Sequence, residues 1–299
     1  MKNIALVTTL PKLEENERIK EEVEKLGFSF SLIDMSEFGF EIKDGKLLVN
    51  AINKFVSVEI KDINAEIVIV RGIFLAIKTI SVIINSLRER GIKIFDNNFL
   101  EHRYSIDKVT DLVKLSIANI SVPDSYYSRD FNKYYELAKK LNYPFVLKSS
   151  RMGKGANVFL IKSEDELKSF IDEAESEGNS AKSFLLQEFI DYKFDLRVLV
   201  IGESVFTMRR IPKEGEFRAN FSLGGDVERF ELDEDGKSLA VEAMTAVGMS
   251  VGGVDILIDK NDKKYILEVN HTAGFVGMEK ATGQNIGKVY VEHAIANAK

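Results

Sequence analysis

Along the first hundred residues, short apolar runs alternate with longer segments in which apolar side chains recur every three or four positions. The apolar runs are Ile4 to Val7, Phe28 to Ile33, Ile67 to Val70 and Ile92 to Phe95. The helical period covers Glu14 to Leu26 and Leu75 to Arg90. Strands that alternate with helices in this way are typical of a small α/β domain with a parallel sheet. We therefore predict such a domain over residues 1–100.

The turn after the first apolar run argues against a dinucleotide-binding domain. This turn, Thr8-Thr9-Leu10-Pro11, contains no glycine. The Rossmann fingerprint requires glycines at this place, because the backbone must approach the pyrophosphate closely. We expect the N-terminal domain to form a wall of a substrate site instead.

After about residue 100 the pattern changes to a mixture of helices and antiparallel strands. Helices are predicted from Tyr104 to Ala118, from Asp130 to Leu141, from Ser163 to Glu175, from Glu234 to Met249 and from Ile286 to Ala296. Strands are predicted over Pro144 to Lys148, Phe184 to Ile190, Leu196 to Ile201 and Val205 to Met208. Ser163 and Glu166 have the spacing of a capping box.

The last predicted hairpin places two carboxylates opposite each other. If its strands turn at Asn261-Asp262, opposed residue numbers sum to 523, so Asp255 faces Glu268 and Asn270 shares their face. Opposed carboxylates repel unless a cation lies between them. Two carboxylates and an amide oxygen suit Mg²⁺, with positions left for phosphate oxygens. This hairpin therefore predicts a site for metal-bound nucleotide.

The alternative for this segment is a solvated hairpin whose acids face water. The other face argues against it, because its residues are all apolar and predict a core. These residues are Val254, Ile256, Ile258, Leu267 and Val269. The same register opposes Leu257 to Ile266 beside the acids, where they would form an apolar floor for a nucleobase.

Composition excludes several classes of function. The chain has 299 residues, 45% of them hydrophobic, which is enough for two or three packed units. Its 41 basic and 47 acidic residues leave a net charge of −6, so we expect neither nucleic acid nor a membrane as partner. The absence of cysteine excludes disulfides and thiolate chemistry, and three histidines make a histidine metal cage improbable. No apolar run reaches the roughly 20 residues that span a bilayer, so we expect a cytoplasmic protein.

Three further segments carry candidate chemistry, each with a simpler alternative. Lys148 precedes a loop containing Gly153 and Gly155, which can close backbone amides over phosphates or can be an ordinary flexible hairpin. The strand end at Glu188-Phe189 offers backbone groups for an adenine edge, or simply emerges into solvent. Asp195 and Arg197 share one face of a strand, where they can form a structural ion pair.

Basic residues cluster just before the acidic hairpin. Arg209-Arg210 is followed by Lys213, Arg218 and Asn220. Arginine forks suit carboxylate and phosphate oxygens, so the cluster can hold an acyl acceptor and a transferring phosphoryl group. A solvated basic loop is the alternative.

Taken in order from about Lys108 to the C-terminus, these segments resemble the ATP-grasp superfamily, and more closely the RimK-type ligases that add glutamate or another amino acid to a carboxylate. The passages that carry the resemblance are Arg209-Arg210 with Lys213 to Asn220, Gly253 to Leu257, and Glu268 to Asn270 leading to Gly283. The resemblance implies an ATP-grasp fold of mixed α/β and α+β character. In it, the N-terminal α/β (pre-ATP-grasp) domain precedes a central subdomain, residues 101–182, and a C-terminal subdomain, residues 183–299.

The resemblance also implies a role for each candidate residue. ATP phosphates would contact Lys108 and Lys148, beneath a lid that contains Gly153 and Gly155. Adenine would contact Glu188 and Phe189. Asp195 would contact the ribose or another part of the nucleotide. Asn220 and Arg218 would lie near the transferred phosphate, and Arg209, Arg210 and Arg218 would stabilise the acylphosphate. Asp255, Glu268 and Asn270 would hold two Mg²⁺ ions, with Mn²⁺ as the alternative ion.

The implied reaction joins an amino acid, with glutamate as one candidate, to a carboxylate of a peptide, a protein C-terminus or a small molecule. The carboxylate takes the γ-phosphate of ATP, and an amine then displaces phosphate to form an amide. A homo-oligomer is also implied. The alternatives are a stand-alone small-molecule ligase of the glutathione-synthetase or D-alanine ligase kind, and a nucleotide-binding regulator without turnover.

The chain departs from the family pattern at places that bear on its substrates. Leu223 stands where an arginine is expected, and His271-Thr272 replaces the small residues that commonly follow the metal asparagine. The segment from Arg151 to Ala156 also has less glycine than usual. None of these departures changes a predicted metal ligand.

Overall fold

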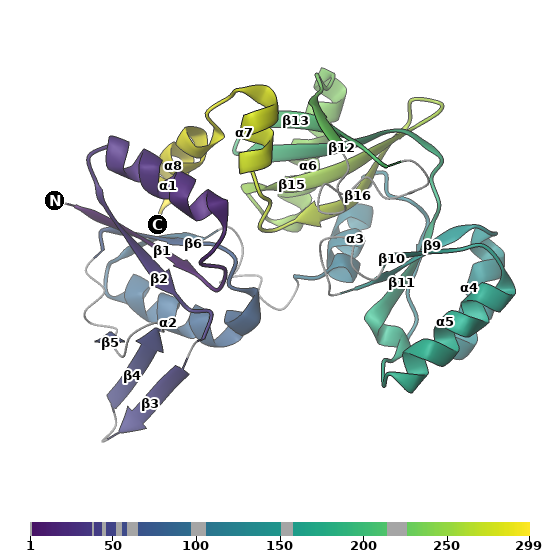
Figure 1. The fold of residues 1–299 in the computed structure, drawn as a ribbon, viewed down its shortest axis with the longest axis horizontal. Coiled ribbons are helices and arrows are strands. Elements are labelled where there is room, and N and C mark those ends of the chain that lie inside the picture. The colour runs from purple at the N-terminus through teal and green to yellow at the C-terminus, as the bar shows by residue number, and fades with distance from the viewer. Residues whose placement is uncertain are drawn as a thin grey trace.

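The N-terminal part of the chain forms a four-stranded parallel sheet, as predicted (Figure 1). The computed structural model describes residues 2–37, 39–43, 46–51, 56–58, 65–96, 106–150, 158–213 and 226–299. The sheet has the order β2-β1-β6-β7, formed by β1 (Asn3–Thr8), β2 (Ser29–Asp34), β6 (Ile67–Val70) and β7 (Lys93–Asp96). The two central strands are buried almost throughout, and β6 and residues Ile4 to Val7 of β1 are all apolar, because helices cover both faces of the sheet.

The helix near the C-terminus completes this N-terminal domain. One face of the sheet packs against α1 (Glu14–Lys25) and α8 (Ile286–Asn297), and the other against α2 (Ile77–Glu89), which follows the 3₁₀ turn η2 (Phe74–Ala76). Ile4 and Leu6 thus share one core with Tyr290 and Val291. Both ends of the chain lie beside this sheet, and Lys299 exchanges two backbone hydrogen bonds with Ile94. A segment of the predicted C-terminal subdomain, residues 183–299, therefore packs on the N-terminal sheet.

A small antiparallel sheet extends from the N-terminal domain between β2 and β6. It consists of β3 (Gly39–Lys43), β4 (Lys46–Ala51) and β5 (Val56–Val58), in that order. Figure 1 shows its strands projecting away from the rest of the chain. The hydrophobic pattern did not predict these strands.

The central subdomain is a four-stranded antiparallel sheet with its own core. Its order is β10-β9-β11-β8, formed by β8 (Ser125–Tyr126), β9 (Phe145–Ser149), β10 (Val158–Ile161) and β11 (Phe184–Glu188). The helices α4 (Tyr134–Leu141) and α5 (Glu164–Ser176) pack on it, with the 3₁₀ turns η3 (Phe131–Lys133) and η4 (Ala181–Ser183). Ser163 caps α5 as predicted, and Glu166 reaches back to the backbone N–H of Lys162.

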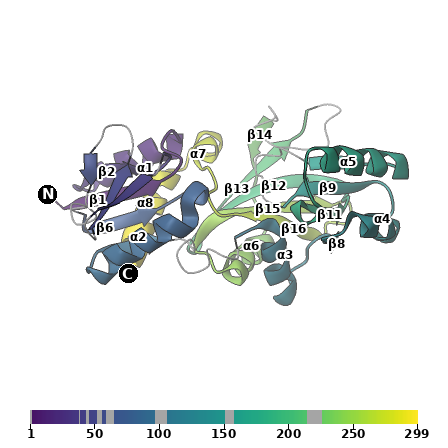
Figure 2. The same cartoon turned by 90° about the horizontal axis from the view of Figure 1, so that it is seen from below.

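The C-terminal sheet has five antiparallel strands in the order β14-β13-β12-β15-β16. These are β12 (Tyr192–Ile201), β13 (Ser204–Ile211), β14 (Asp226–Arg229), β15 (Val251–Asp259) and β16 (Lys264–Asn270). Figure 2 shows α3 (Lys108–Ile117) and α6 (Glu234–Val247) on one side of this sheet. The short α7 (Val276–Thr282) leads from the sheet back towards α8. No helix of the described residues is long and apolar enough to cross a bilayer.

The helix α3 belongs by its packing to the C-terminal sheet. Its Leu115 lies in the same core as Ile266 of β16 and Ala243 of α6. The sequence division at residues 101–182 grouped this helix with the central strands. The structure instead makes α3 part of the layer that backs β16.

The hairpin of β15 and β16 reaches the predicted opposition of Asp255 and Glu268 by an unexpected route. Its turn has three residues between Asp259 and Lys263, with Asp262 at φ 63°, so the pairs nearest the turn sum to 522. An irregularity at Leu267 then shifts the register, and from Asp255 onwards the pairs sum to 523. Asp255 opposite Glu268 is therefore confirmed.

The same bulge makes one detail of the predicted hairpin wrong. Leu257 pairs with Tyr265, and Ile256 pairs with Ile266. Ile266, which is fully buried, takes the core position expected for Leu267. The bulge adds one residue to β16, so its residues between the bulge and the turn point to the sheet face opposite to the one predicted.

Candidate active site

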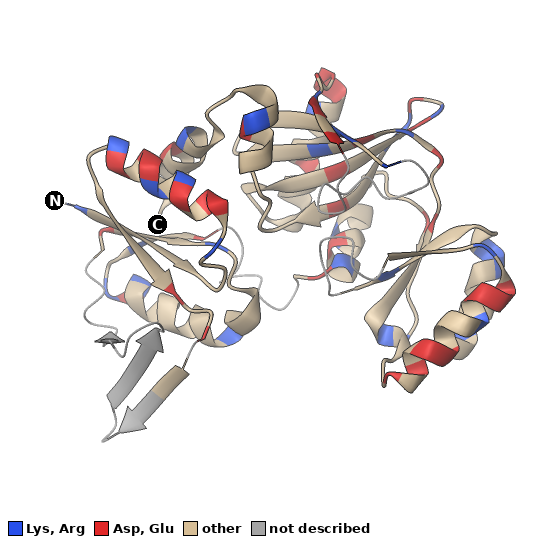
Figure 3. Cartoon of the chain, in the orientation of Figure 1, with Lys and Arg blue, Asp and Glu red and all other residues tan. Residues whose placement is uncertain are grey.

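Strand alternation divides the side chains of the C-terminal sheet between two environments. Leu196 and Val198 of β12 face α3 and α6, whereas Asp195 and Arg197 point to the opposite face. On that face Arg197, Asp255 and Glu268 form one row across β12, β15 and β16. Figure 3 shows basic and acidic segments on the same strands of this sheet. The charged residues therefore gather by register on one half of the face.

The other half of that face is apolar and holds the N-terminal domain. Leu199, Ile201 and Val251 share a core with Ile19, Phe275 and other residues of the N-terminal layer. The charged half of the face thus lies next to the interface between the C-terminal sheet and the N-terminal domain. Its strands are fixed by this interface on one side and by α3 and α6 on the other.

Asp255 is buried and neutralised by two arginines. Its Oδ2 lies 3.2 Å from Nη2 of Arg197 and 3.1 Å from Nη2 of Arg210. Nε of Arg197 makes a further charge contact with Oδ1, without hydrogen-bond alignment. Burial alone would raise the pKa of Asp255, but Arg197 and then Arg210 outweigh it and hold the pKa below its ordinary value. Asp255 is therefore a carboxylate at neutral pH.

Asp195 shares Arg210 with Asp255. Nε of Arg210 donates to Oδ1 of Asp195 at 2.7 Å, and Nη2 contacts the same oxygen. Burial raises the pKa of Asp195 to about 6, although Arg210 opposes the shift, and the neighbouring Asp255 raises it further. One buried guanidinium thus serves two carboxylates.

Two lysines from different elements approach Glu268. Nζ of Lys108, the first residue of α3, lies 3.2 Å from Oε2 of Glu268. Lys148 of β9 is 4% exposed, and burial lowers its pKa to about 8. The negative charges of Glu268 and Asp255 oppose this lowering of the pKa, whereas the positive charge of Lys108 adds to it. The central sheet therefore brings Lys148 to the charged face of the C-terminal sheet.

The cluster has the charge balance of a polyanion site. Among the described residues, the four cations Lys108, Lys148, Arg197 and Arg210 meet the three carboxylates Asp195, Asp255 and Glu268. When all are ionised, one positive charge remains. Phosphate groups would be attracted, whereas a lone divalent cation would meet lysines and arginines already paired with the acids.

The donor set fits Mg²⁺ only if it is shared with phosphate. Asp255, Glu268 and Asn270 lie on one face, and Oδ1 of Asn270 accepts a hydrogen bond from the backbone N–H of Thr272 at 3.3 Å. No three acidic, histidine or cysteine side chains in the described ranges come together as a metal site by themselves. Two carboxylates and an amide leave Mg²⁺ short of its six oxygens, which nucleotide phosphates can supply.

Not every predicted site residue joins this cluster. Arg209 points to the opposite face from Arg210, where it lies over the Phe194 ring and 3.1 Å from Glu228. Glu188 and Phe189 lie at the end of β11, where Glu188 exchanges hydrogen bonds with Asp124. Four predicted residues lie outside the described residues: Gly153, Gly155, Arg218 and Asn220.

The role of Arg197 was not predicted from the sequence. It appeared only as a partner for Asp195, yet its guanidinium contacts Asp255 instead. The usable signal was a single arginine within the apolar run from Leu196 to Ile201, because a buried arginine needs a carboxylate across the sheet.

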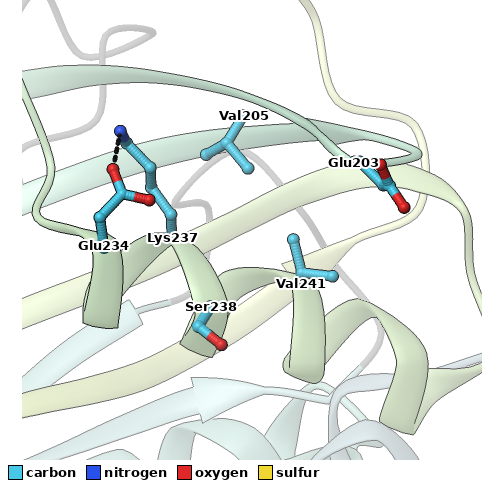
Figure 4. A pocket seen from close by; sticks show the side chains of 6 residues that line it. All are labelled: Glu203, Val205, Glu234, Lys237, Ser238 and Val241. Atoms are coloured by element: carbon cyan, nitrogen blue, oxygen red, sulfur yellow. Dashed lines mark hydrogen bonds and ion pairs between the residues drawn. The ribbon is translucent and has the colours of Figure 1, made fainter.

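A shallow cavity of about 470 Å³ lies elsewhere (Figure 4). It is lined by Glu203, Val205, Glu234, Lys237, Ser238 and Val241. Lys237 and Glu234 pair with each other across 2.6 Å at its edge. It contains no residue of the predicted site.

An N-terminal parallel-sheet domain, followed by two antiparallel sheets that bring lysines and carboxylates together, defines the ATP-grasp class of proteins. The chain belongs to the RimK-like ATP-grasp domain family, whose model matches residues 105–294. This match covers α3 and all strands of both antiparallel sheets.

Relatives in curated collections bear ligase names. A protein of Haemophilus influenzae (strain PittEE), named probable alpha-L-glutamate ligase, is 34% identical over 195 residues, which is 64% of each chain. A protein of the same name from Mannheimia succiniciproducens is 30% identical over 295 residues, or 96% of each chain. Beta-citrylglutamate synthase B of Danio rerio is 29% identical over 64% of this chain and 48% of its own length. The chain thus spans less than two thirds of the first of these relatives and nearly all of the second.

Solved structures share the fold over the whole chain. The ATP-grasp ligase PsnB complexed with minimal precursor superposes with a TM-score of 0.74 at 20% identity, over 99% of both chains. The macrocyclase MdnC of Microcystis aeruginosa MRC, bound with precursor peptide MdnA, gives 0.70 at 15% identity, over 99% of this chain and 100% of its own. At these identities the likeness concerns the fold.

Proposed function

We propose that the chain is an ATP- and Mg²⁺-dependent ligase that joins a carboxylate to an amine. The observation that carries the proposal is the opposition of Asp255 and Glu268 on adjacent strands, with Lys108 and Lys148 brought to the same face. Phosphoryl transfer requires positioned cations more than a dedicated nucleophile. The cluster supplies those cations.

In the proposed reaction an oxygen of the substrate carboxylate attacks the γ-phosphorus of ATP, and the bond from that phosphorus to ADP breaks. The resulting acylphosphate is then attacked at its acyl carbon by an amine. The carbon–oxygen bond to phosphate breaks, the amine loses a proton, and an amide, ADP and phosphate remain. The lysines offset the charge of the phosphates in both steps.

Asp255, Glu268 and Asn270 would hold Mg²⁺ together with the nucleotide, as two ions in the full proposal. The ions would supply Lewis-acid stabilisation of the phosphoryl oxygens. Arg197 and Arg210 hold Asp255 ionised and fixed in place before nucleotide binds. Arg218 and Asn220 remain proposed contacts of the transferred phosphate.

The names of the relatives support an amino acid as the amine. The Haemophilus and Mannheimia proteins are named glutamate ligases, and glutamate also appears in the name of the Danio rerio protein. We therefore propose glutamate as the first amine to test. The acceptor carboxylate would belong to a peptide, a protein C-terminus or a small molecule.

The test is ADP and phosphate release by the purified protein with Mg-ATP, with and without pooled amino acids and candidate carboxylates, followed by mass spectrometry. Release that requires both pools, with a product heavier by one amino-acid residue, is the expected result. ATP binding without turnover in any pool would favour a nucleotide-binding regulator instead.

A further inference from the structure

The helix α3 contacts the end of β16 at two points with equal spacing. Lys108 lies 3.2 Å from Glu268, and Oδ2 of Asp111 lies 2.9 Å from Nε2 of His271. The two helix residues are three apart, and so are their two partners. Residues three apart on a helix lie on the same side, one turn from each other. One side of the first turn of α3 therefore contacts the residues on either side of Asn270.

The second of these contacts is buried more deeply than the first. Asp111 is 4% exposed and His271 is 8% exposed, whereas Lys108 and Glu268 are more open side chains. A carboxylate oxygen can only accept, so Nε2 of His271 carries the hydrogen. A buried polar pair is costly to break because each partner loses a hydrogen bond that compensates for lost water, and among the described residues Asp111 would keep only its 4.0 Å contact with Lys114. The contact therefore favours one orientation of α3 relative to the end of β16.

The start of α3 is fixed as well. Asp107 caps the helix by accepting from the backbone N–H groups of Val109 and Thr110, both at 2.9 Å. The backbone N–H of Lys108 points to the carbonyl of Ser150, just beyond β9, at 3.4 Å. Lys114 reaches the carbonyl of Val247 at the end of α6. The first turn of α3 is thus the junction of both antiparallel sheets.

Apolar packing alone would not set this junction. Leu112 and Leu115 hold α3 against the sheet, but apolar contact is non-directional and tolerates rotation of a helix about its axis. A rotation by one residue, about 100°, would carry Lys108 away from Glu268. The Asp111–His271 contact opposes that rotation from one turn further along the helix.

We propose that Asp111 and His271 form a positioning pair that sets the register of α3 against β16, so that Lys108 and the Glu268–Asn270 segment receive the same metal-bound nucleotide. The inference rests on the proposed function and deepens it. Neither residue is assigned a contact with nucleotide, so both act through Lys108 and through the segment that follows Asn270.

The test measures binding rather than turnover. The dissociation constant of Mg-ADP is measured by calorimetry for the wild type, for Asp111→Leu, for His271→Leu and for the double variant. We expect each single variant to bind roughly tenfold more weakly, as for other groups that orient ligand residues. The double variant should bind no more weakly than the singles, because either change already removes the contact. His271→Gln, which keeps an N–H donor for Asp111, should recover most of the affinity.

A histidine elsewhere in the chain supplies the matched control. His293 of α8 lies 3.3 Å from Ser250 and away from the charged cluster. His293→Leu should change thermal stability without changing the dissociation constant of Mg-ADP. If the Leu variants at 111 and 271 do not fold, Asp111→Asn preserves shape and should still weaken binding, because an amide is a weaker acceptor than a carboxylate.

The outcomes separate this inference from the proposed function. A wild type that does not bind Mg-ADP would count against the proposed function and this inference together. Wild-type binding with affinities of the Asp111 and His271 variants within about twofold of it would overturn the positioning pair alone, even if melting temperatures fell.

Discussion

Nη2 of Arg210 lies 3.1 Å from Oδ2 of Asp255, and Nε of the same guanidinium donates to Oδ1 of Asp195 at 2.7 Å. All three side chains are buried. The cation of β13 therefore neutralises one carboxylate on β12 and one on β15. Arg210 thus helps to keep the candidate metal ligand Asp255 ionised.

We expect Arg210→Met to lower the free energy of unfolding by about 3–5 kcal/mol, because two buried carboxylates lose their shared partner. The neighbouring Arg209→Met should cost less than about 1 kcal/mol, because Arg209 forms a partly exposed pair with Glu228. Urea denaturation of both variants makes the comparison. Equal losses would contradict the difference in burial on which the expectation rests.

Glu268→Ala should abolish Mg-nucleotide turnover, because the carboxylate opposite Asp255 is lost, and should leave the fold intact, because the side chain is partly exposed. Glu228→Ala, on the edge strand β14, is the control and should retain turnover. ADP formation and far-ultraviolet circular dichroism report the two properties. Ordinary ADP formation by Glu268→Ala would remove this residue from the proposed metal site.

The depressed pKa of Lys148 predicts a dependence of stability on pH. The folded protein releases this proton near pH 8, whereas the unfolded chain holds it to about 10.5. Between these values the unfolded state binds more protons, so stability rises with pH. The wild type should gain up to about 3 kcal/mol relative to Lys148→Met across this range. Denaturation of both proteins at pH 7, 9 and 10.5 checks it, and a constant difference would rule out the shift.

Glu15 should be important for attaching the N-terminal domain. Its Oε1 accepts from the backbone N–H groups of Phe275 and Val276 at the start of α7, at 3.1 and 3.3 Å. A Cβ on Gly274 would stand 2.9 Å from the same oxygen, so glycine permits this approach. Glu15→Ala should cost about 1–2 kcal/mol of unfolding free energy.

The adjacent Glu14 provides the control for that experiment. It forms an exposed pair with Lys280, and Glu14→Ala should change the free energy of unfolding by less than about 0.5 kcal/mol. Chemical denaturation measures both variants. Equal losses at Glu14 and Glu15 would contradict the expectation that the hydrogen bonds of Glu15 to α7 stabilise the fold more than an exposed ion pair does.

Local sequence determined the elements and part of the site. Ser163 begins α5 and the apolar runs form the parallel sheet, because caps and hydrophobic periods act within a few residues. Asp255 opposite Glu268 was also predicted, from an assumed two-residue turn. Yet the turn length and the bulge at Leu267 were not foreseen, and the prediction at the acids held because the two shifts cancel.

Only the tertiary structure decided which predicted residues meet. Arg210 reaches Asp255 while its neighbour Arg209 faces away, and α8 packs on the N-terminal sheet as well as on strands of the C-terminal sheet. Lys108 and Lys148 come together although they lie in different subdomains. Contacts of this kind join segments far apart in the chain, and they are selected by how apolar faces are buried against one another. That choice depends on the whole fold, so no local pattern contains it.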